Sequence, residues 1–244
     1  MEPKGIATLE RALTVLAAFT PAEPTLSLAE ISRRTGLYKS TLLRLLATLQ
    51  HFDYIGQQED GSYHVGVGAF YLGSLYQSWV QPADLIRPVL QRLVEQTGES
   101  ASFNVREGAV RVCVYRVDSP HKIRDHVRIG DVLPLAAGAA GKILCAYSDD
   151  PPAGDWDAVR AGFLAVTRGE IESETAGVSS PVFGVGGKCE GALAITGPAY
   201  RFDDDAVNTM QLALLRASAE LSLKLGGRSA ELEAALRRME TAHA

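Results

Sequence analysis

The sequence predicts an α+β fold in two domains, on three observations. Residues up to Gln81 carry apolar side chains mainly at helical spacing, whereas later residues mix amphipathic helices with strand-like alternation. Pro82 interrupts the apolar pattern between the two parts and marks the expected boundary. With 244 residues and 46% hydrophobic content, the chain can bury a sizeable core, and its length suits one or two domains.

Composition argues against several classes of protein, among them general nucleic-acid coating, secreted and membrane-spanning proteins. The formal net charge of -5 argues against general coating of nucleic acid, so any DNA binding must come from a local basic patch. Cys113, Cys145 and Cys189 show no CxxC or Cys/His spacing, which is typical of a reduced compartment. The start of the chain lacks the apolar core of a signal peptide, and no apolar run approaches the roughly 20 residues of a spanning helix. We therefore expect a cytoplasmic protein without a membrane partner.

The first helices follow from apolar spacing and end signals. Residues 6–20 predict a helix whose apolar face combines Ile6, Leu9, Leu13, Leu16 and Ala17. Ser27 and Glu30 form a capping-box pattern that opens a second helix. Gly36 supplies a turn, and a third helix is expected at residues 38–51.

The stretch from Ser27 to Leu49 indicates a helix-turn-helix. Its third-helix leucines share one face at positions 42, 45, 46 and 49, and hydroxyl and cationic groups share the other. Such groups reach phosphates and base edges in a major groove, so we expect binding to double-stranded DNA. An ordinary amphipathic helix pair with a solvated basic face is the alternative. The predicted contacts in this stretch are Ser27, Arg33, Arg34, Lys39, Ser40, Thr41, Arg44 and Thr48.

A β-hairpin and an apolar helix complete the first part. Strand-like residues 54–57 and 63–67 flank the turn signal Asp60-Gly61, which predicts a wing. Ser62 and Tyr63 are its expected DNA contacts, with a plain exposed hairpin as the alternative. Residues 68–81 are too apolar for a loose tether, and we interpret them as a linker helix packing between subunits or against the first domain. Core packing would explain this helix equally well.

The second part predicts an antiparallel sheet flanked by helices, with pocket-forming loops on one side. Helices are expected at residues 83–97, 138–146, 155–163 and 203–225, the last with Asp203 as its cap. Strands are expected at residues 101–106, 110–117, 180–185 and 191–196, with a polar segment at 118–132 and a Gly-, Ser- and Glu-rich loop at 167–180. The polar tail after Gly226 is expected to be helical but frayed.

Catalytic and metal-binding motifs do not emerge. The GAAGK run at 138–142 has the wrong spacing for a P-loop, and Ile143 stands where Ser or Thr would hold magnesium. His121 and His126 are five residues apart, which does not place both on one helical face for zinc. No nucleophile–base arrangement is visible. We expect no catalytic residue, no metal ion and no cofactor, and inert thiols.

The chain resembles the IclR family of bacterial transcription regulators over nearly its whole length. The resemblance rests on the runs TGLYKSTLLRLLATL, GSYHVG, IGDVLPLAAGAAGKILCA, GVSSPVF and GALAITGPAYRF. It implies a winged helix-turn-helix at residues 5–67, a linker helix at 68–81, a GAF-like effector-binding domain at 82–228 and a polar tail at 229–244. It further implies dimers that assemble into tetramers. Operator binding would be controlled by a small metabolite, often a carboxylate or an aromatic acid of catabolism, with repression favoured over activation.

The resemblance also places the effector pocket, at Leu133, Ala139, Ala140, Gly177, Val178, Ser179, Ser180, Ala194 and Thr196. A helix starting near Ala139 would present free backbone N–H groups to an anion. The loop residues Glu170, Glu172 and Glu174 depart from the family pattern and leave a neutral or cationic effector open. Positive charge could come instead from Arg116, Arg124 and Arg128. A small-molecule binding module or remnant enzyme, using the winged helix to dimerise, is the alternative function.

Overall fold

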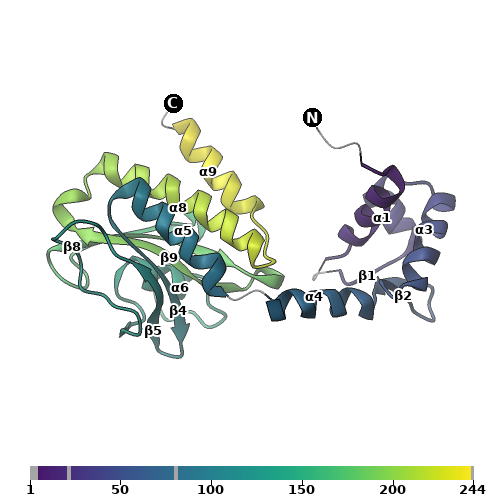
Figure 1. Ribbon diagram of the computed structural model, residues 1–244, viewed down its shortest axis with the longest axis horizontal. Helices are drawn as coiled ribbons and strands as arrows, with labels where there is room; N and C mark the ends of the chain where they lie inside the picture. The colour runs from purple at the N-terminus through teal and green to yellow at the C-terminus, as the bar shows by residue number, and fades with distance from the viewer. Residues whose placement is uncertain (1–4, 21–22, 80–81, 243–244) are drawn as a thin grey trace. The chain divides into compact units, whose positions relative to one another are not determined.

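The computed structural model describes residues 5–20, 23–79 and 82–242. The chain divides into two compact units, Met1–Gln81 and Pro82–Ala244. The first unit is mainly helical with a small sheet, and the second combines a larger antiparallel sheet with helices (Figure 1). The predicted α+β class and the helix-turn-helix are confirmed.

The first unit is three helices, a three-stranded sheet and a further helix. Its elements are α1 (Ala7–Ala17), β1 (Thr25–Leu26), α2 (Leu28–Thr35), α3 (Lys39–His51), β2 (Ile55–Gln57), β3 (Tyr63–Val65) and α4 (Val67–Trp79). The hairpin of β2 and β3 forms as predicted, and β1 adds to it in the antiparallel order β1-β3-β2. Only two residues long, β1 is too short to show alternation in the sequence.

The core of the first unit is built on α3. The four leucines predicted for its inner face are all buried, against Val15, Ile31 and Ile55. The predicted apolar face of α1 is buried only in part, since Leu16 packs on the core but Ile6 and Leu9 are 70% and 56% exposed. The side of α1 that meets this core carries Ala12, Val15, Leu16 and, just beyond the helix, Phe19.

Local signals set the helix-turn-helix bend. The Ser27 Oγ accepts a hydrogen bond from the Glu30 N–H at 3.2 Å, which caps α2 as expected. At the other end of α2, Gly36 adopts φ 68°, the left-handed conformation that ends a helix without a Cβ clash. The Tyr38 residue then starts α3 in an extended conformation.

The second unit is a six-stranded antiparallel sheet in the order β6-β5-β4-β9-β8-β7. Its strands are β4 (Ser100–Glu107), β5 (Val110–Val117), β6 (Val132–Pro134), β7 (Ala165–Arg168), β8 (Thr175–Phe183) and β9 (Cys189–Pro198). Its helices are α5 (Pro82–Thr97), α6 (Gly138–Ala146), α7 (Asp157–Gly162), α8 (Asp204–Lys224) and α9 (Ala230–Ala242).

Two apolar layers sandwich this sheet. One layer packs α5 and α8 on the face that carries Phe103, Leu193 and Ile195. The other packs α6 on the face that carries Ala192 and Ala194 (Figure 1). Successive residues of β9 therefore serve opposite layers, and the α6 side has the smaller side chains, which leaves room there.

Three segments differ from the sequence prediction. The loop expected at 167–180 is short, because β7 runs to Arg168 and β8 begins at Thr175. Its small residues, which suggested a loop, pair with β9 along their length. The edge strand β6 lies at the end of the polar segment, where no strand was expected. The tail is an ordered helix, since Leu232 and Ala235 are 1% and 4% exposed against α8.

A β-bulge in β5 controls which side chains face α6. Phe103 pairs with Tyr115, but the next residue, Asn104, pairs with Cys113, so Val114 is an extra residue. Ser102 and Asn104 share one face of β4, and their partners Arg116 and Cys113 therefore share it too. Without the bulge, residues three apart would point to opposite faces.

Candidate DNA interface and ligand pocket

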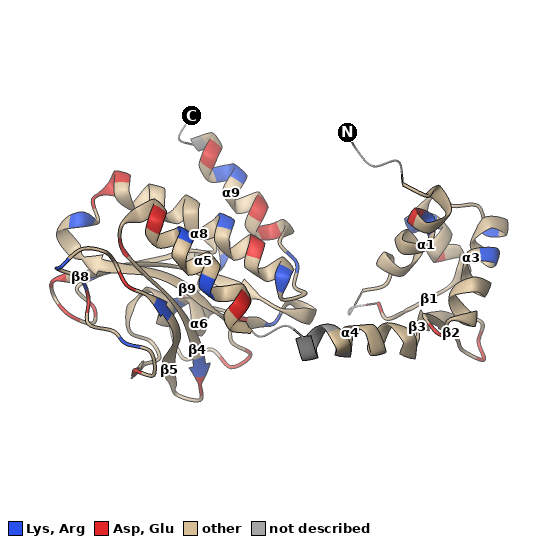
Figure 2. Ribbon diagram, viewed as in Figure 1, with Lys and Arg blue, Asp and Glu red and all other residues tan. Residues whose placement is uncertain are grey.

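The outward face of α3 is polar and cationic. Lys39, Ser40, Arg44 and Thr48 are exposed and Thr41 is half-buried, while the four leucines of the predicted inner face are buried and Leu43 is exposed. Figure 2 colours the basic residues of this helix blue. Within the described parts of the chain, Lys39 and Arg44 form no ion pair, so both charges are available to phosphates or base edges.

The structure adds Tyr38 to this surface. Its side chain is 84% exposed at the N-cap of α3, beside Lys39 and Ser40. An exposed phenol at the start of a recognition helix can donate to a phosphate or contact a base edge. The sequence signal for it was its place directly after the turn, next to the predicted contacts Lys39 and Ser40.

The two arginines of α2 are engaged within the protein. Arg33 and Arg34 both bond the carboxylate of Glu30, at 2.6 and 2.8 Å. Arg34 also bonds Glu23 at 2.5 Å and the Ala18 carbonyl at 2.9 Å, and its side chain is only 18% exposed. The hydrogen bonds from Arg33 and then Arg34 lower the pKa of Glu30 to about 2. Two of the four cations expected to serve DNA are thus neutralised locally.

The hairpin of β2 and β3 exposes fewer groups that could contact DNA than its sequence suggested. Ser62 donates both its N–H and its hydroxyl to Asp60, at 2.8 and 2.6 Å, and these bonds lower the pKa of that carboxyl. Tyr63 is 5% exposed and belongs to the core, which corrects its expected position at the DNA-facing tip. The turn instead exposes Glu59 and Asp60, carboxylates that repel phosphates (Figure 2).

The second unit contains a pocket of about 170 Å³ between the α6 face of the sheet and the loops around it. Six of the nine predicted effector residues line it, namely Leu133, Ala139, Ala140, Gly177, Ala194 and Thr196. The other three do not. Val178 and Ser180 point to the opposite face of β8, and Ser179 lies under α6 with its hydroxyl bonded to the Leu193 carbonyl at 2.6 Å. Val178 and Ser180 leave the pocket because alternate residues of a strand point to opposite faces.

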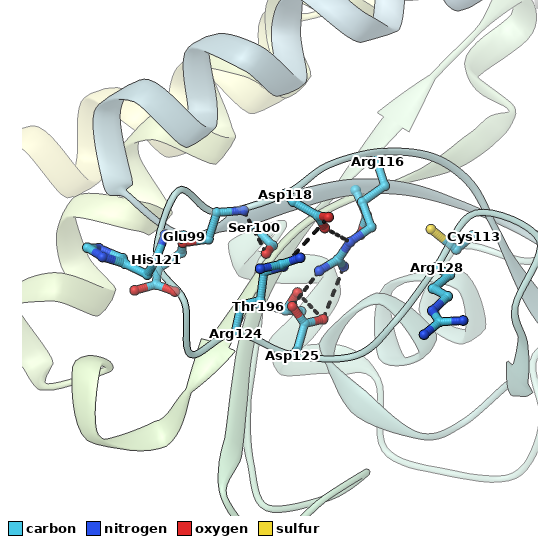
Figure 3. A network of polar contacts seen from close by, with 12 residues as sticks. Glu99, Ser100, Cys113, Arg116, Asp118, His121, Arg124, Asp125, Arg128 and Thr196 are labelled. Carbon is cyan, nitrogen blue, oxygen red and sulfur yellow. Dashed lines mark hydrogen bonds and ion pairs between the residues drawn. The ribbon is translucent and has the colours of Figure 1, made fainter.

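Arg116 is one of two buried arginines in the pocket wall. It reaches Asp125 through two hydrogen bonds, at 2.5 and 3.1 Å, and each side chain is only 5% exposed. Asp118 accepts a third bond from Arg116 at 2.7 Å, and Thr196 donates to Asp125 at 2.9 Å (Figure 3). Burial lowers the pKa of Arg116, but the bonds to Asp125 and Asp118 outweigh it and raise that pKa. This cation is fully compensated.

Arg111 is the other, and it has no compensating carboxylate among the described residues. Its residue is 4% exposed, and its Nη1 donates to the neutral Oδ1 of Asn104 at 2.8 Å. Its Nε finds no acceptor in the described parts of the chain. Burial lowers the pKa of this guanidinium. Of the arginines that the sequence suggested, Arg116 lines the pocket but is paired with carboxylates, and Arg111, which was not among them, supplies the uncompensated charge.

The N-terminus of α6 is covered by a side chain from a distant loop. The Gly138 N–H donates to Glu170 Oε2 at 3.3 Å, and Lys142 reaches Glu170 Oε1 at 2.5 Å. Ala137, the N-cap residue, makes no side-chain capping bond. Glu170 thus sits where the helix would attract an anion.

Burial disfavours the thiolate form of all three cysteines. Burial raises the pKa of Cys113 and of Cys189 to about 11, and it also raises the pKa of Cys145. Among the described residues there is no group of three or more His, Cys, Asp or Glu side chains arranged to hold a metal ion. No described helix is both long and apolar enough to span a bilayer.

Family models match both units. The IclR helix-turn-helix domain matches residues 8–59. The model described as bacterial transcriptional regulator IclR C-terminal matches residues 80–156 and 154–223. Together they cover the α3 surface and the pocket described above.

Characterised relatives and solved structures agree with the two family matches. The HTH-type transcriptional regulator BhcR of Paracoccus denitrificans is 27% identical over 249 residues, which is 92% of this chain and 89% of that protein. The HTH-type transcriptional repressor AllR of Escherichia coli K12 is 31% identical over 142 residues, 58% of this chain and 52% of that protein. A structure described as an IclR transcriptional regulator from Silicibacter sp. TM1040 has a TM-score of 0.78 at 27% identity, covering 91% of this chain and 97% of that one. Pseudomonas aeruginosa HmgR shares the fold, with a TM-score of 0.72 at 20% identity over 91% of this chain and 99% of that one.

Proposed function

Because the chain belongs to the IclR family of bacterial transcription regulators, we propose that a small molecule in the pocket of its second unit controls its binding to operator DNA. Like its relatives, the chain is a transcription regulator and not an enzyme. The observation that carries the control is the pocket itself. Its lining includes the buried charged side chains of Arg111, Arg116 and Asp125, which can recognise a polar ligand.

The proposed DNA contacts centre on the start of α3. Lys39, Ser40, Thr41 and Arg44 combine exposure with donors that no carboxylate occupies. Thr48 bonds the Arg44 carbonyl at 3.1 Å and remains a secondary candidate. Ser27, Arg33, Arg34 and Ser62 have internal partners and would support the DNA-binding surface more than contact DNA.

The effector is proposed to be a small organic acid, aliphatic or aromatic. The buried guanidinium of Arg111 and the N-terminus of α6 both favour negative charge, which outweighs the argument for a neutral or cationic effector from the three loop glutamates. Leu133, Ala139 and Ala194 give apolar surface for the rest of such a molecule.

Self-association completes the proposal. Large apolar side chains are exposed at Ile6, just before α1, at Leu9 and Leu13 of α1, and at Phe70 and Leu72 of α4. Such surface is typical of interfaces, and it supports a dimer or a dimer of dimers. Two α3 helices in a dimer would read a pseudo-palindromic operator with half-sites about 34 Å apart. Repression is the proposed sign of control, by analogy with AllR.

The experiment is a footprint and mobility-shift titration of the full chain on DNA from upstream of its own gene and the neighbouring operons. We expect a protected pseudo-palindrome whose affinity falls steeply with salt. A screen of organic acids against this complex should find compounds that change its affinity. If no fragment were protected and the affinity for unrelated DNA were the same, the alternative would hold. The protein would then be a small-molecule binding module whose first unit serves dimerisation.

A further inference from the structure

We propose that Glu170 is a built-in carboxylate that occupies the N-terminus of α6 until an anionic effector, anchored by Arg111, takes its place. This inference rests on the proposed function and adds how the pocket recognises and responds to charge. It assigns Arg111 as the anchoring residue and Glu170 as an internal competitor.

Arg111 is proposed as the anchor because its buried guanidinium has no anionic partner among the described residues. A guanidinium that is almost fully withdrawn from water needs an anion or a full set of acceptors. Arg111 is 4% exposed, yet among the described residues it bonds only the neutral amide of Asn104 and its Nε bonds nothing. Arg116, on the same face of the same strand, has Asp125 and Asp118. The pocket therefore holds one compensated cation and one uncompensated cation, and the second points to a ligand carboxylate.

Glu170 is proposed as the competitor because its carboxylate lies at the N-terminus of α6, where an anion would bind. It belongs to the loop at 169–174, 32 residues from Gly138 in sequence, and its carboxylate still accepts the first N–H of α6. With Lys142 at 2.5 Å, it makes the contacts that a bound anion would make at this helix. The N–H bond is long at 3.3 Å, and the side chain is 35% exposed, so the contact is loose enough to be exchanged.

The two features meet at Gly138. A Cβ placed on this residue would lie 3.6 Å from Arg111 Nη2 and 2.7 Å from Ile171 Cδ1. The guanidinium of Arg111, which has no carboxylate partner among the described residues, the α6 amide and the loop that carries Glu170 thus converge within reach of one carboxylate. A ligand that bridges Arg111 and the α6 N-terminus removes Glu170 from Gly138 and releases the 169–174 loop from the pocket.

The first test needs no variant. Calorimetric titrations of the full chain would compare each carboxylate with its neutral isostere, benzoate with benzamide and pyruvate with pyruvamide. We expect at least one acid to bind at least about tenfold more tightly than its amide, because only the acid pairs with a buried cation. Equal affinity within a pair that binds, or no saturable binding of either acid, would overturn the proposal.

The second test removes the anchor. Arg111→Gln should weaken binding of the acid by about tenfold or more and abolish the preference over the amide. Arg128→Gln is the matched control, because Arg128 is exposed and lies apart from the buried cluster (Figure 3). Equal losses in both variants would show a general charge effect and overturn the role of Arg111. A thermal melt accompanies each variant, and the isostere comparison and the loop variants stand even if Arg111→Gln unfolds.

The third test removes the competitor. Glu170→Gln should tighten binding of the acid by about threefold to tenfold, since the anion no longer displaces a carboxylate. Glu174→Gln removes the same charge from an exposed residue of the same loop, outside the pocket lining. It should leave affinity unchanged. Unchanged affinity in Glu170→Gln, or equal gains in both variants, would show that Glu170 does not compete with the effector.

The outcomes separate this inference from the function on which it rests. If amides and acids bound equally and both altered operator affinity, ligand control would stand and the charge exchange would fall. If acids bound through Arg111 but no operator were found, the charge exchange would stand and the regulatory role would fall.

Discussion

Arg116 holds both carboxylate oxygens of Asp125 inside the pocket wall, at 2.5 and 3.1 Å. Neither side chain has water to replace the other, because each is 5% exposed. A buried pair of this kind is costly to break from one side only, since the remaining charge stays buried without its partner.

Asp125→Asn is therefore expected to destabilise the second unit by about 3–5 kcal/mol. The same change at Asp118 is the control, because its carboxylate contacts the same guanidinium but its side chain is 53% exposed. Asp118→Asn should cost about 1 kcal/mol or less. Urea denaturation followed by circular dichroism measures both, and equal costs would mean that the Asp125 pair is solvated in solution.

Arg44→Ala should weaken operator binding by about 1–3 kcal/mol, provided that Arg44 contacts a base. A mobility-shift titration at fixed salt measures this loss. Arg237→Ala, on the exposed side of α9, removes the same charge from the second unit and should change affinity far less. A loss as large in Arg237→Ala would exclude specific readout by Arg44.

Gly141→Ala should destabilise the pocket, because a Cβ at this position would lie 2.1 Å from the Leu135 carbonyl oxygen. The helix and the preceding loop would have to separate, at a cost of about 1–3 kcal/mol. Gly162 in α7 is the control, since a Cβ there meets nothing within 4 Å. Gly162→Ala should be neutral or stabilising by up to about 1 kcal/mol. Thermal unfolding of the two variants gives the comparison.

The Glu30 contacts predict a pH dependence of the first unit. The pKa of Glu30 falls from 4.5 to about 2 in the folded chain, so its stabilising effect is complete above 4.5 and is lost as pH falls toward 2. The difference in stability between wild type and Glu30→Gln should therefore shrink steadily over that window. Denaturant unfolding of both proteins at several pH values measures it. A difference that stayed constant would show that the bonds to Arg33 and Arg34 are not formed in solution.

The parts of the fold that the sequence predicted are those in which nearest neighbours along the chain decide the structure. The leucine spacing of α3 and the bounds of α6 at Gly138 and Ala146 follow from local pattern, and the structure matches both. The strand β8 was missed in its first half, because its Gly and Ser residues owe their conformation to pairing with β9.

The charged features of the pocket depend on contacts across the sheet. Arg111 alternates with Val110 and Val112 and shares the parity of Cys113, which was the one sequence signal for an inward-facing arginine. Nothing local indicated that Asn104 would be its neighbour or that Glu170 would reach Gly138. Long-range contacts of this kind are set by register and loop path, which single-residue patterns do not encode.

The bulge at Val114 lets Arg111 and Arg116, which are five residues apart in β5, face the same side of the sheet. Deleting Val114 would restore regular pairing and leave Arg116 opposite Ser102, still on the pocket side. Restoring regular pairing without a deletion would instead turn Arg116 toward the layer of α5 and α8, away from Asp125. Homologues that sense other molecules are therefore expected to differ here in residue type, and to lose one residue of this strand wherever they lose the bulge.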